Sequence, residues 1–234
     1  MSSVPSQRGR KVAAPKRNPL IPFYIGVGAL LIVGVAFLVT ILVRNNAASQ
    51  ITELNAPVGQ TPEGFWYRGN PEAPVTVIEY GDYQCPACAF YERNLAEIIN
   101  RDYVETGKVR FIYHEFPLDS HVHAVPAAEA ARCAGDQGKF WQMHAMLFIN
   151  QDQWSPLSNV QNVFSGYAGQ LGLNRATFDA CMSAGTHNAA VVAAGQAAAA
   201  AGANATPTFS VNGQLVSASE LPGTIEAALR AAGQ

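Results

Sequence analysis

The run from Leu20 to Val43 holds 24 residues without one charged side chain. A helix rises about 1.5 Å per residue, so this run is long enough to cross the roughly 30 Å hydrocarbon core of a membrane. A cleaved signal peptide is the alternative, but its apolar region usually has only about 7–15 residues. We therefore predict one transmembrane helix at 20–43, retained as a signal anchor.

Charge is distributed unevenly on the two sides of this segment. Residues 1–19 contain five basic side chains and no acidic one, and only Arg44 follows the segment closely. Basic residues stay on the cytoplasmic side of a membrane, so residues 1–19 are predicted to be a cytoplasmic tail and the chain after the span is expected to be exported. The expected location is the plasma or inner membrane, crossed once.

The exported part is acidic. From Asn45 onward it has 9 basic and 17 acidic side chains and no basic run. A phosphate backbone would find little to bind on such a surface, so nucleic acid is excluded as a partner. All four cysteines lie in this part, and an even count in an oxidising compartment agrees with disulfide chemistry.

Composition and β-branched runs indicate where the folded domain begins. Residues 44–64 are rich in Asn, Ala, Gln, Thr and Pro, which is typical of a flexible linker, so we expect the folded body from about Phe65. Val75–Tyr80 and Val109–His114 are apolar runs between turn residues. They predict two strands, the first of them buried on both faces.

A helix is predicted between these strands, at 86 to about 104. Residues suited to one buried stripe recur along it at spacings of three, four and three: Cys88, Tyr91, Leu95 and Ile98. Such spacing is typical of the inward face of a helix, so the region forms a strand–helix–strand unit.

Helical patterns fill residues 122–202, which predicts an inserted all-helical domain. One helix is expected to end near Cys133, and the others are expected at 140–149, 159–171, 175–183 and in an alanine-rich stretch from Asn188.

The C-terminal part returns to strands. Pro207–Val211 and Gln214–Ser217 flank Asn212-Gly213, a strong signal for a two-residue hairpin. A last helix is predicted at 219–232, with Ser219 as its N-cap.

The spacing Cys85-Pro86-Ala87-Cys88 predicts a reactive centre. Two intervening residues let both thiols close a small disulfide ring when the first lies at a helix N-terminus. Free amide N–H groups and the helix dipole stabilise a thiolate there, so we expect a low pKa for Cys85. Pro86 suits the first helical position, because its missing N–H is no loss there. Cys85 is therefore predicted to be the attacking thiolate of a thiol–disulfide exchange, and Cys88 the resolving thiol.

Two other interpretations of this spacing are weaker. A structural zinc site needs four ligands, and the chain has no second Cys-x-x-Cys and no histidines at metal spacing, so neither a metal nor another cofactor is expected. A purely structural bridge between Cys85 and Cys88 would close almost no loop and would stabilise the fold little.

Four separated segments resemble a known family. They are VIEYGDYQCPAC (77–88), HEFPL (114–118), QGKFW (137–141), and TPTF (206–209) with VNG (211–213). In this order they closely resemble the DsbA-like thiol–disulfide oxidoreductases of the thioredoxin-fold superfamily, from about Phe65 to the C-terminus. The resemblance implies an α/β thioredoxin fold with a central mixed sheet, formed by 65–121 and 203–234 and interrupted by the helical domain 122–202.

The resemblance also implies further site residues. Pro207 matches the cis-proline whose loop faces the redox pair and binds the substrate backbone, with Thr206 directly before it. Glu79 matches the family's buried acid beneath the cysteines. It shares a strand face with two valines, and a carboxyl group in apolar surroundings has a raised pKa, which suits transfer of the Cys88 proton. The alternative is an ordinary strand glutamate that faces water.

The direction of electron flow is left open by the sequence. The best-known oxidising members have histidine before the second cysteine, where this chain has the uncharged Ala87. Our leading hypothesis is oxidation of cysteine pairs in exported proteins, with a membrane redox partner that restores the disulfide. The alternatives are a disulfide reductase or isomerase fed by a membrane electron donor, and a tethered chaperone or peptide-binding module. Oxidation and reduction use the same residues and differ in redox potential and partner.

Cys133 and Cys181 are predicted to form a second, structural disulfide. They are the remaining exported pair, and both lie in the predicted helical domain. The alternative is two buried free thiols, since free cysteine packs well as a small hydrophobic residue.

Overall fold

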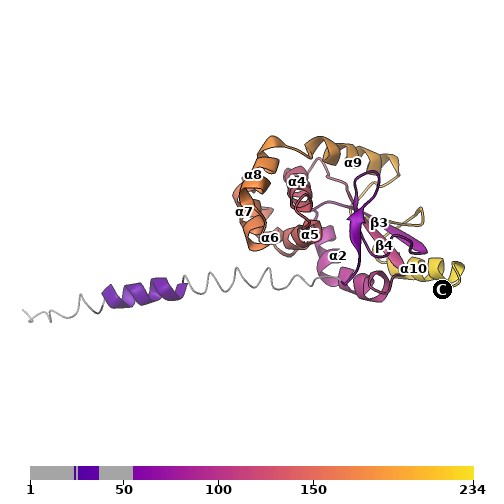
Figure 1. Cartoon of the computed structure of the whole chain (residues 1–234), viewed down its shortest axis with the longest axis horizontal. Coiled ribbons are helices and arrows are strands. Elements are labelled where there is room, and N and C mark those ends of the chain that lie inside the picture. The colour runs from indigo at the N-terminus through magenta and orange to yellow at the C-terminus, as the bar shows by residue number, and fades with distance from the viewer. Residues whose placement is uncertain (1–23, 25, 37–54) are drawn as a thin grey trace, which may run out of the picture. The chain divides into compact units, whose positions relative to one another are not determined.

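Figure 1 shows the computed structural model of the chain, which describes Tyr24 and residues 26–36 and 55–234. The chain divides into two compact units, 1–43 and 44–234. The described residues of the first unit are helical. Within the described part of the chain, no helix combines the length and the apolar character that a membrane crossing requires.

Some of the predictions for the N-terminal part fall on residues that are not described. The basic tail at 1–19 lies entirely outside the described residues, and so do parts of the predicted span at 20–43 and linker residues 44–54. The membrane anchor and its orientation therefore stay predictions.

The second unit is built around one mixed sheet. In the described residues the strand order of this sheet is β1-β2-β4-β3-β5-β6. β3 (Val75–Gly81) and β4 (Val109–Glu115) pair in parallel at its centre, where the sequence predicts two strands. The other pairs are antiparallel. The outer strands are β1 (Val58–Gln60), β2 (Trp66–Arg68), β5 (Thr208–Val211) and β6 (Gln214–Val216).

Helices cover both faces of this sheet. Val77 packs in one core cluster with residues of α2 (Pro86–Asn94) and α10 (Leu221–Ala231). Tyr80, whose side chain points to the opposite face, packs in another cluster with α9 (Asn188–Ala200). Coverage on both sides explains why β3 is apolar on both faces. The predicted thioredoxin-type α/β fold is thereby confirmed.

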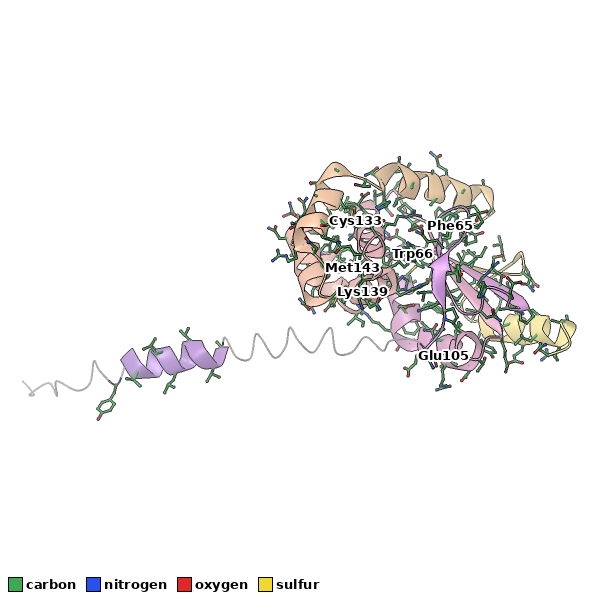
Figure 2. All side chains as sticks on the ribbon, in the orientation of Figure 1. Phe65, Trp66, Glu105, Cys133, Lys139 and Met143 are labelled. Atoms are coloured by element: carbon green, nitrogen blue, oxygen red, sulfur yellow. A yellow bond between two sulfur atoms is a disulfide. The ribbon has the colours of Figure 1, made fainter. Side chains whose placement is uncertain are left out.

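The described residues between β4 and β5 form helices, in agreement with the predicted insertion. The sequence patterns of the insertion predicted all of its longer helices. The four-residue helix α6 was not predicted, because it is too short to show a helical period. Trp66 of β2, labelled in Figure 2, stacks on Phe140 with ring centroids 5.2 Å apart, and this contact ties the sheet to these helices. Besides α9, they are α4 (Ala124–Gly135), α5 (Phe140–Ile149), α6 (Gln151–Trp154), α7 (Gln161–Gln170) and α8 (Arg175–Ala184).

The folded domain begins before Phe65, so the predicted linker at 44–64 was too long. β1 lies inside it and pairs with β2. This edge strand is short and Val58 is exposed, so it lacks the apolar alternation that reveals strands in a sequence. Backbone pairing holds it instead, and the N–H of Asn55 just before it donates to the Glu105 carboxylate at 3.0 Å.

The predicted helix at 86–104 is interrupted, which was not foreseen. Leu95 leaves the helical region with φ −120°, so the residues after it turn relative to those before it. Ile98, predicted on the buried stripe, is 44% exposed, whereas Ile99 is 2% exposed. The three parts are α2, α3 (Ala96–Ile99) and the π-helical η1 (Asn100–Val104).

The predicted hairpin between β5 and β6 is confirmed. Asn212 and Gly213 both have positive φ, 48° and 92°, as the favoured two-residue turn requires.

The last helix starts at Leu221, and Ser219 is not its N-cap, contrary to the prediction. Glu220 occupies that position, and its carboxylate accepts hydrogen bonds from the N–H and the hydroxyl group of Ser217 at 3.0 and 2.5 Å. The Glu220 carboxylate thus closes the turn that precedes the helix, and the N-cap lies one residue later than predicted.

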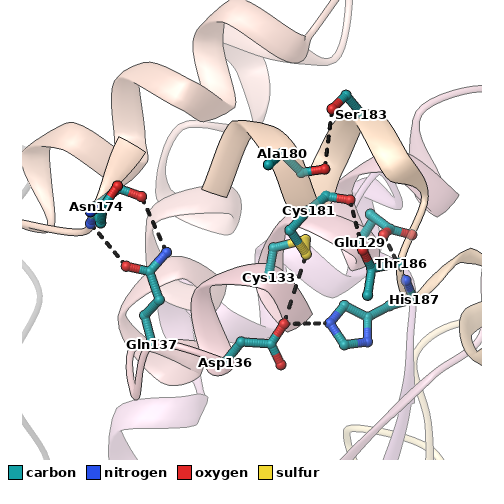
Figure 3. Close-up of a disulfide and its surroundings, with 10 residues drawn as sticks. All are labelled: Glu129, Cys133, Asp136, Gln137, Asn174, Ala180, Cys181, Ser183, Thr186 and His187. Carbon is teal, nitrogen blue, oxygen red and sulfur yellow. Dashed lines mark hydrogen bonds and ion pairs between the residues drawn. A yellow bond between two sulfur atoms is a disulfide. The ribbon is translucent and has the colours of Figure 1, made fainter. Parts of the chain in front are cut away.

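Cys133 of α4 and Cys181 of α8 form a disulfide, as predicted, so the alternative of two free thiols is wrong (Figure 3). The bridge links helices whose cysteines are 48 residues apart in the sequence. It therefore closes a large loop of the insertion.

Reduction of this disulfide should lower the free energy of unfolding by about 4 kcal/mol, since a closed loop of 48 residues removes that much chain entropy from the unfolded state. Urea unfolding should be compared with and without reductant in a variant carrying Cys85→Ser and Cys88→Ser, in which only this bridge can be reduced. Equal midpoints under both conditions would show that the bridge does not stabilise the domain.

Candidate active site

The pair Cys85 and Cys88 lies where β3 passes into α2. Cys85 is the N-cap residue, with φ −71° and ψ 123° in the extended region, and Pro86 is the first helical residue. Cys88 lies in the first turn of the helix. Both thiols are free; Cys85 is 7% exposed and Cys88 is 0% exposed. A reacting molecule can therefore reach only the first sulfur.

The two thiols differ strongly in acidity. A hydrogen bond from Cys88 lowers the pKa of Cys85 to about 5, with help from Thr206 and from the N–H groups of Cys88 and Ala87 and against the effect of burial. Burial raises the pKa of Cys88 well above the usual thiol value, and the hydrogen bond to Cys85 and the charge of Glu79 raise it further. At neutral pH Cys85 is thus a thiolate and Cys88 a thiol, as the predicted roles require.

The loop before β5 faces Cys85. β5 pairs antiparallel with β3, with Thr208 opposite Tyr80, and this register brings the loop to the carboxyl end of β3. The Thr206–Pro207 peptide bond is cis, as the family resemblance implies. The Cys85 sulfur lies 3.4 Å from the Thr206 carbonyl oxygen, to which it donates a hydrogen bond in its protonated form. The backbone of this loop is therefore within reach of the reactive sulfur.

Glu79 lies in the middle of the sheet, between Tyr113 of β4 and Phe209 of β5. It is 0% exposed, so it does not face water. Neither of its carboxyl oxygens has a hydrogen-bond partner among the described residues. Burial raises the pKa of Glu79 well above the usual carboxyl value, and the charge of Glu92 raises it further, while Arg68 acts in the opposite direction. A buried acid of this kind holds its proton to higher pH than an ordinary carboxyl group and can exchange it with Cys88.

A buried polar cluster beside Glu79 was missed by the sequence analysis. Arg68 Nη2 and His144 Nε2 lie 3.9 and 3.1 Å from Glu92 Oε1. His144 Nδ1 lies 3.0 Å from the Tyr83 hydroxyl oxygen. Burial lowers the pKa of His144, so the ring is neutral, donates its Nε2–H to the carboxylate and accepts from the Tyr83 hydroxyl.

The charges of this cluster decide which acid keeps a proton. Burial disfavours a charge on Glu92, but His144 and Arg68 outweigh it, so the pKa of Glu92 is lowered. One guanidinium group cannot compensate two buried carboxylates, and Glu79 therefore stays protonated to higher pH. These residues come from β2, β3, α2 and α5, so no local sequence pattern could have shown that they meet.

The turn that carries Cys85 is held by Asp82, also missed. Its Oδ1 accepts from the Gln84 N–H at 2.7 Å, and its Oδ2 accepts from the Leu118 N–H at 2.9 Å and from His121 Nδ1 at 2.8 Å. The Cys85 N–H donates to the Asp82 carbonyl at 3.1 Å. In an Asx turn an aspartate side chain accepts the N–H of the residue two positions later, as Asp82 does with Gln84. An aspartate in a turn is a sequence signal for this motif, and it could have indicated the role of Asp82.

A possible metal cluster among the described residues consists of Cys133, Cys181 and His187, whose ligand atoms lie within 4.8 Å of one another. Both sulfurs are joined in the disulfide and cannot act as thiolate ligands. His187 Nε2 lies 2.8 Å from Asp136 Oδ2 (Figure 3). This donor set does not fit a metal while the bridge is intact.

Comparisons with known proteins agree with this site. The family profile described as thioredoxin matches residues 60–231. The Na(+)/H(+) antiporter NhaA 1 of Salinispora arenicola is 36% identical over 165 residues, which are 70% of this chain and 24% of the antiporter. The chain thus spans about a quarter of that relative. A Rickettsia conorii protein provisionally named as a protein-disulfide oxidoreductase is 29% identical over 146 residues, 62% of this chain and 52% of that protein.

Solved structures show the same fold. The crystal structure of oxidised BdbD from Bacillus subtilis aligns with a TM-score of 0.65 and 26% identity, and the alignment covers 75% of this chain and 99% of that chain.

Glu79→Gln should slow the attack of Cys88 on a mixed disulfide at Cys85, most of all above neutral pH. The carboxylate form of Glu79 accepts the Cys88 proton and becomes more abundant as pH rises through its raised pKa, whereas an amide never accepts it. Release of glutathione bound to Cys85, followed across the pH range, should fall about tenfold or more near pH 8. Glu97→Gln, at an exposed position of α3, should behave as the wild type.

Stability gives an independent readout of the same carboxyl group. Glu79 binds its proton more tightly in the folded chain, so its contribution to stability is lost as pH rises from the usual carboxyl pKa through the raised pKa. The free energy of unfolding of Glu79→Gln should therefore exceed that of the wild type by a margin that grows with pH. Equal rates and equal pH dependence of stability would remove Glu79 from proton transfer.

Proposed function

This chain belongs to the thioredoxin family as a DsbA-like thiol–disulfide oxidoreductase, and from this premise we propose that it oxidises cysteine pairs in exported proteins. Cys85 and Cys88 exchange disulfides with the substrate. Glu79 exchanges a proton with Cys88, and Thr206 and Pro207 bind the substrate backbone next to the reactive sulfur.

The difference in acidity between the two thiols carries the proposal. A thiolate at Cys85 stabilises the reduced form of the pair, because it is held by a thiol hydrogen bond and by the amide groups at the start of α2. Whatever stabilises the reduced form makes the disulfide form a stronger oxidant. A low pKa also makes Cys85 a good leaving group. Both effects favour transfer of the disulfide to a substrate.

Oxidation of a substrate proceeds in two exchanges. A substrate thiolate attacks Cys85 in the oxidised pair, the Cys85–Cys88 bond breaks, and Cys88 leaves with its electron pair and takes up a proton from Glu79. A second substrate thiolate then attacks the substrate sulfur of the mixed disulfide, and Cys85 leaves as a stable thiolate. The substrate dithiol loses two electrons and two protons. The pair takes up both electrons and ends as a Cys85 thiolate and a Cys88 thiol, while one proton replaces the one that Glu79 gave and the other passes to solvent.

Exposed apolar side chains near Cys85 suit an unfolded substrate. Phe90 on α2 is 63% exposed, Val122 is 76% exposed and Leu157 is 40% exposed. Val122 directly precedes His123, whose N–H donates to the Gln84 side chain at 2.6 Å, and His123 Nε2 lies 2.6 Å from the Leu157 carbonyl oxygen. Val122 and Leu157 thus lie beside the turn that carries Cys85, and Phe90 lies on the helix that follows this turn. These side chains would contact apolar segments of an unfolded chain.

The proposed location rests on the sequence, and the proposed recycling partner rests on the need to reoxidise the pair. The uncharged run at 20–43 would anchor the protein in the plasma or inner membrane, with residues 1–19 in the cytoplasm and the redox domain outside. The reduced pair must be reoxidised after each turnover, and a redox protein in the same membrane is the proposed partner.

Cys88→Ser should accumulate covalent complexes with disulfide-containing client proteins, because Cys85 still attacks but nothing resolves the product. Near pH 7, Cys85→Ser should trap about one tenth as many covalent complexes as Cys88→Ser, or fewer, since the remaining thiol of Cys88 is buried and has a raised pKa. Each variant is incubated with an oxidised, unfolded protein, and non-reducing gels count the reductant-sensitive complexes.

The comparison of these two matched variants separates the classes of function. A tethered chaperone or a structural bridge predicts no difference between them. Equal trapping by both variants, or trapping by neither, would contradict exchange chemistry at Cys85.

A further inference from the structure

The helical insertion contributes one side chain that contacts the backbone of the redox pair directly. Gln151 is the first residue of α6 and is 3% exposed. Its Nε2 donates hydrogen bonds to the carbonyl oxygens of Tyr83 and Cys85, at 2.7 and 2.9 Å. One amide group therefore links two carbonyl groups of the turn that leads into α2.

Gln151 comes from a well-anchored part of the insertion. Trp154, one turn further along α6, is 0% exposed, and its indole N–H donates to the Leu147 carbonyl at 2.8 Å. Its ring contacts Phe164 of α7, with centroids 5.3 Å apart. Figure 1 shows α6 beside α5, the helix of the insertion that packs against α2. The amide of Gln151 is thus supplied by a fixed element rather than by a loop.

The two contacts restrict the atoms that orient the Cys85 sulfur. The Cys85 carbonyl also accepts the N–H of Ala89 at 3.1 Å, the first hydrogen bond of the helix. A second donor on the same oxygen fixes the plane of the peptide between Cys85 and Pro86. The donor on the Tyr83 carbonyl fixes the peptide before Gln84. With both planes fixed, the torsions of Cys85 cannot relax independently, and its sulfur stays at the amino end of α2.

We propose that Gln151 is a positioning residue of the redox pair: by fixing the carbonyl groups of Tyr83 and Cys85 it holds the Cys85 sulfur against the amide groups of α2. The helical insertion thereby controls how strongly the thiolate is stabilised. The role rests on the thiol–disulfide exchange proposed above. Asp82 and Gln84 shape the same turn from within, whereas Gln151 acts on it from another element.

Gln151→Met is the direct test, because methionine keeps the length and volume of the side chain but removes both donors. The midpoint of Cys85 alkylation by iodoacetamide, expected at about pH 5 in the reduced wild type, should rise by about one unit. Reactivity should then fall about tenfold at pH 4 and change little at pH 8, where the thiol is ionised in both proteins. Gln153→Met is the matched control, since Gln153 lies exposed on the same helix and its side-chain amide donates to Asn150 Oδ1, at 3.1 Å, rather than to the turn that carries Cys85.

A merely structural role for Gln151 predicts a different result. The melting temperature of Gln151→Met would fall while the alkylation midpoint stayed at the wild-type value, and this outcome would overturn the proposal. A wild-type midpoint near the ordinary thiol value would instead contradict the proposed function, and this proposal with it. Failure of this proposal shows as equal alkylation midpoints in the wild type and in Gln151→Met. Failure of the proposed function shows as a wild-type midpoint near the ordinary thiol value, so the two failures are distinguishable. The direction of electron flow does not affect either midpoint.

A second measurement uses the unmodified side chain and does not depend on whether the variant folds. In the reduced wild type the side-chain amide resonances of Gln151 should titrate together with Cys85 near pH 5, and those of Gln153 should not. Replacement Cys85→Ser should abolish the titration. Gln151 resonances that are indifferent to pH between about 4 and 7 would overturn the proposal.

Discussion

A thiolate held at the start of α2 is the interaction on which the rest of this structure depends. Cys85 forms the N-cap, so the unpaired amide groups of the helix and the Cys88 thiol all stabilise its negative charge. The same helix buries Cys88 above Glu79, where a charge is disfavoured. Two chemically identical side chains, three positions apart, thereby acquire opposite protonation states. Their difference provides a nucleophile and leaving group in one sulfur and a protected thiol in the other.

The fold surrounds this helix start from three directions. The parallel pair β3–β4 ends beneath it, β5 presents the loop with Thr206 and Pro207, and the helical insertion closes the remaining side. The two buried carboxyl groups in the same region differ in pKa. Arg68 and His144 favour the ionised form of Glu92, and Glu79 is left as the acid that keeps its proton to higher pH. The insertion therefore belongs to the redox site, because the Gln151 side chain donates hydrogen bonds to the backbone of the reactive turn.

Features set by neighbours in the sequence could be predicted, and features set by tertiary contacts could not. The hairpin at Asn212-Gly213 and the N-terminal position of Cys85 depend on local turn and helix chemistry, which the sequence shows directly. The identity of Glu79 and Pro207 as site residues needed the family resemblance. The edge strand β1 is held by backbone pairing, and the break at Leu95 has no glycine or proline to mark it. The contacts of Gln151 join elements far apart in the chain, so no spacing reveals them.

The reduction potential of the Cys85–Cys88 pair tests the central claim most directly. Equilibration with glutathione buffers should be followed in a variant with Cys133→Ser and Cys181→Ser, so that a single disulfide reports. A pair whose reduced form is stabilised by a thiolate is predicted to have a potential between about −120 and −180 mV, the range from strong to moderate protein oxidants. A potential near about −270 mV, typical of a reducing thioredoxin, would contradict the account, because the thiolate at α2 would then not favour transfer of the disulfide.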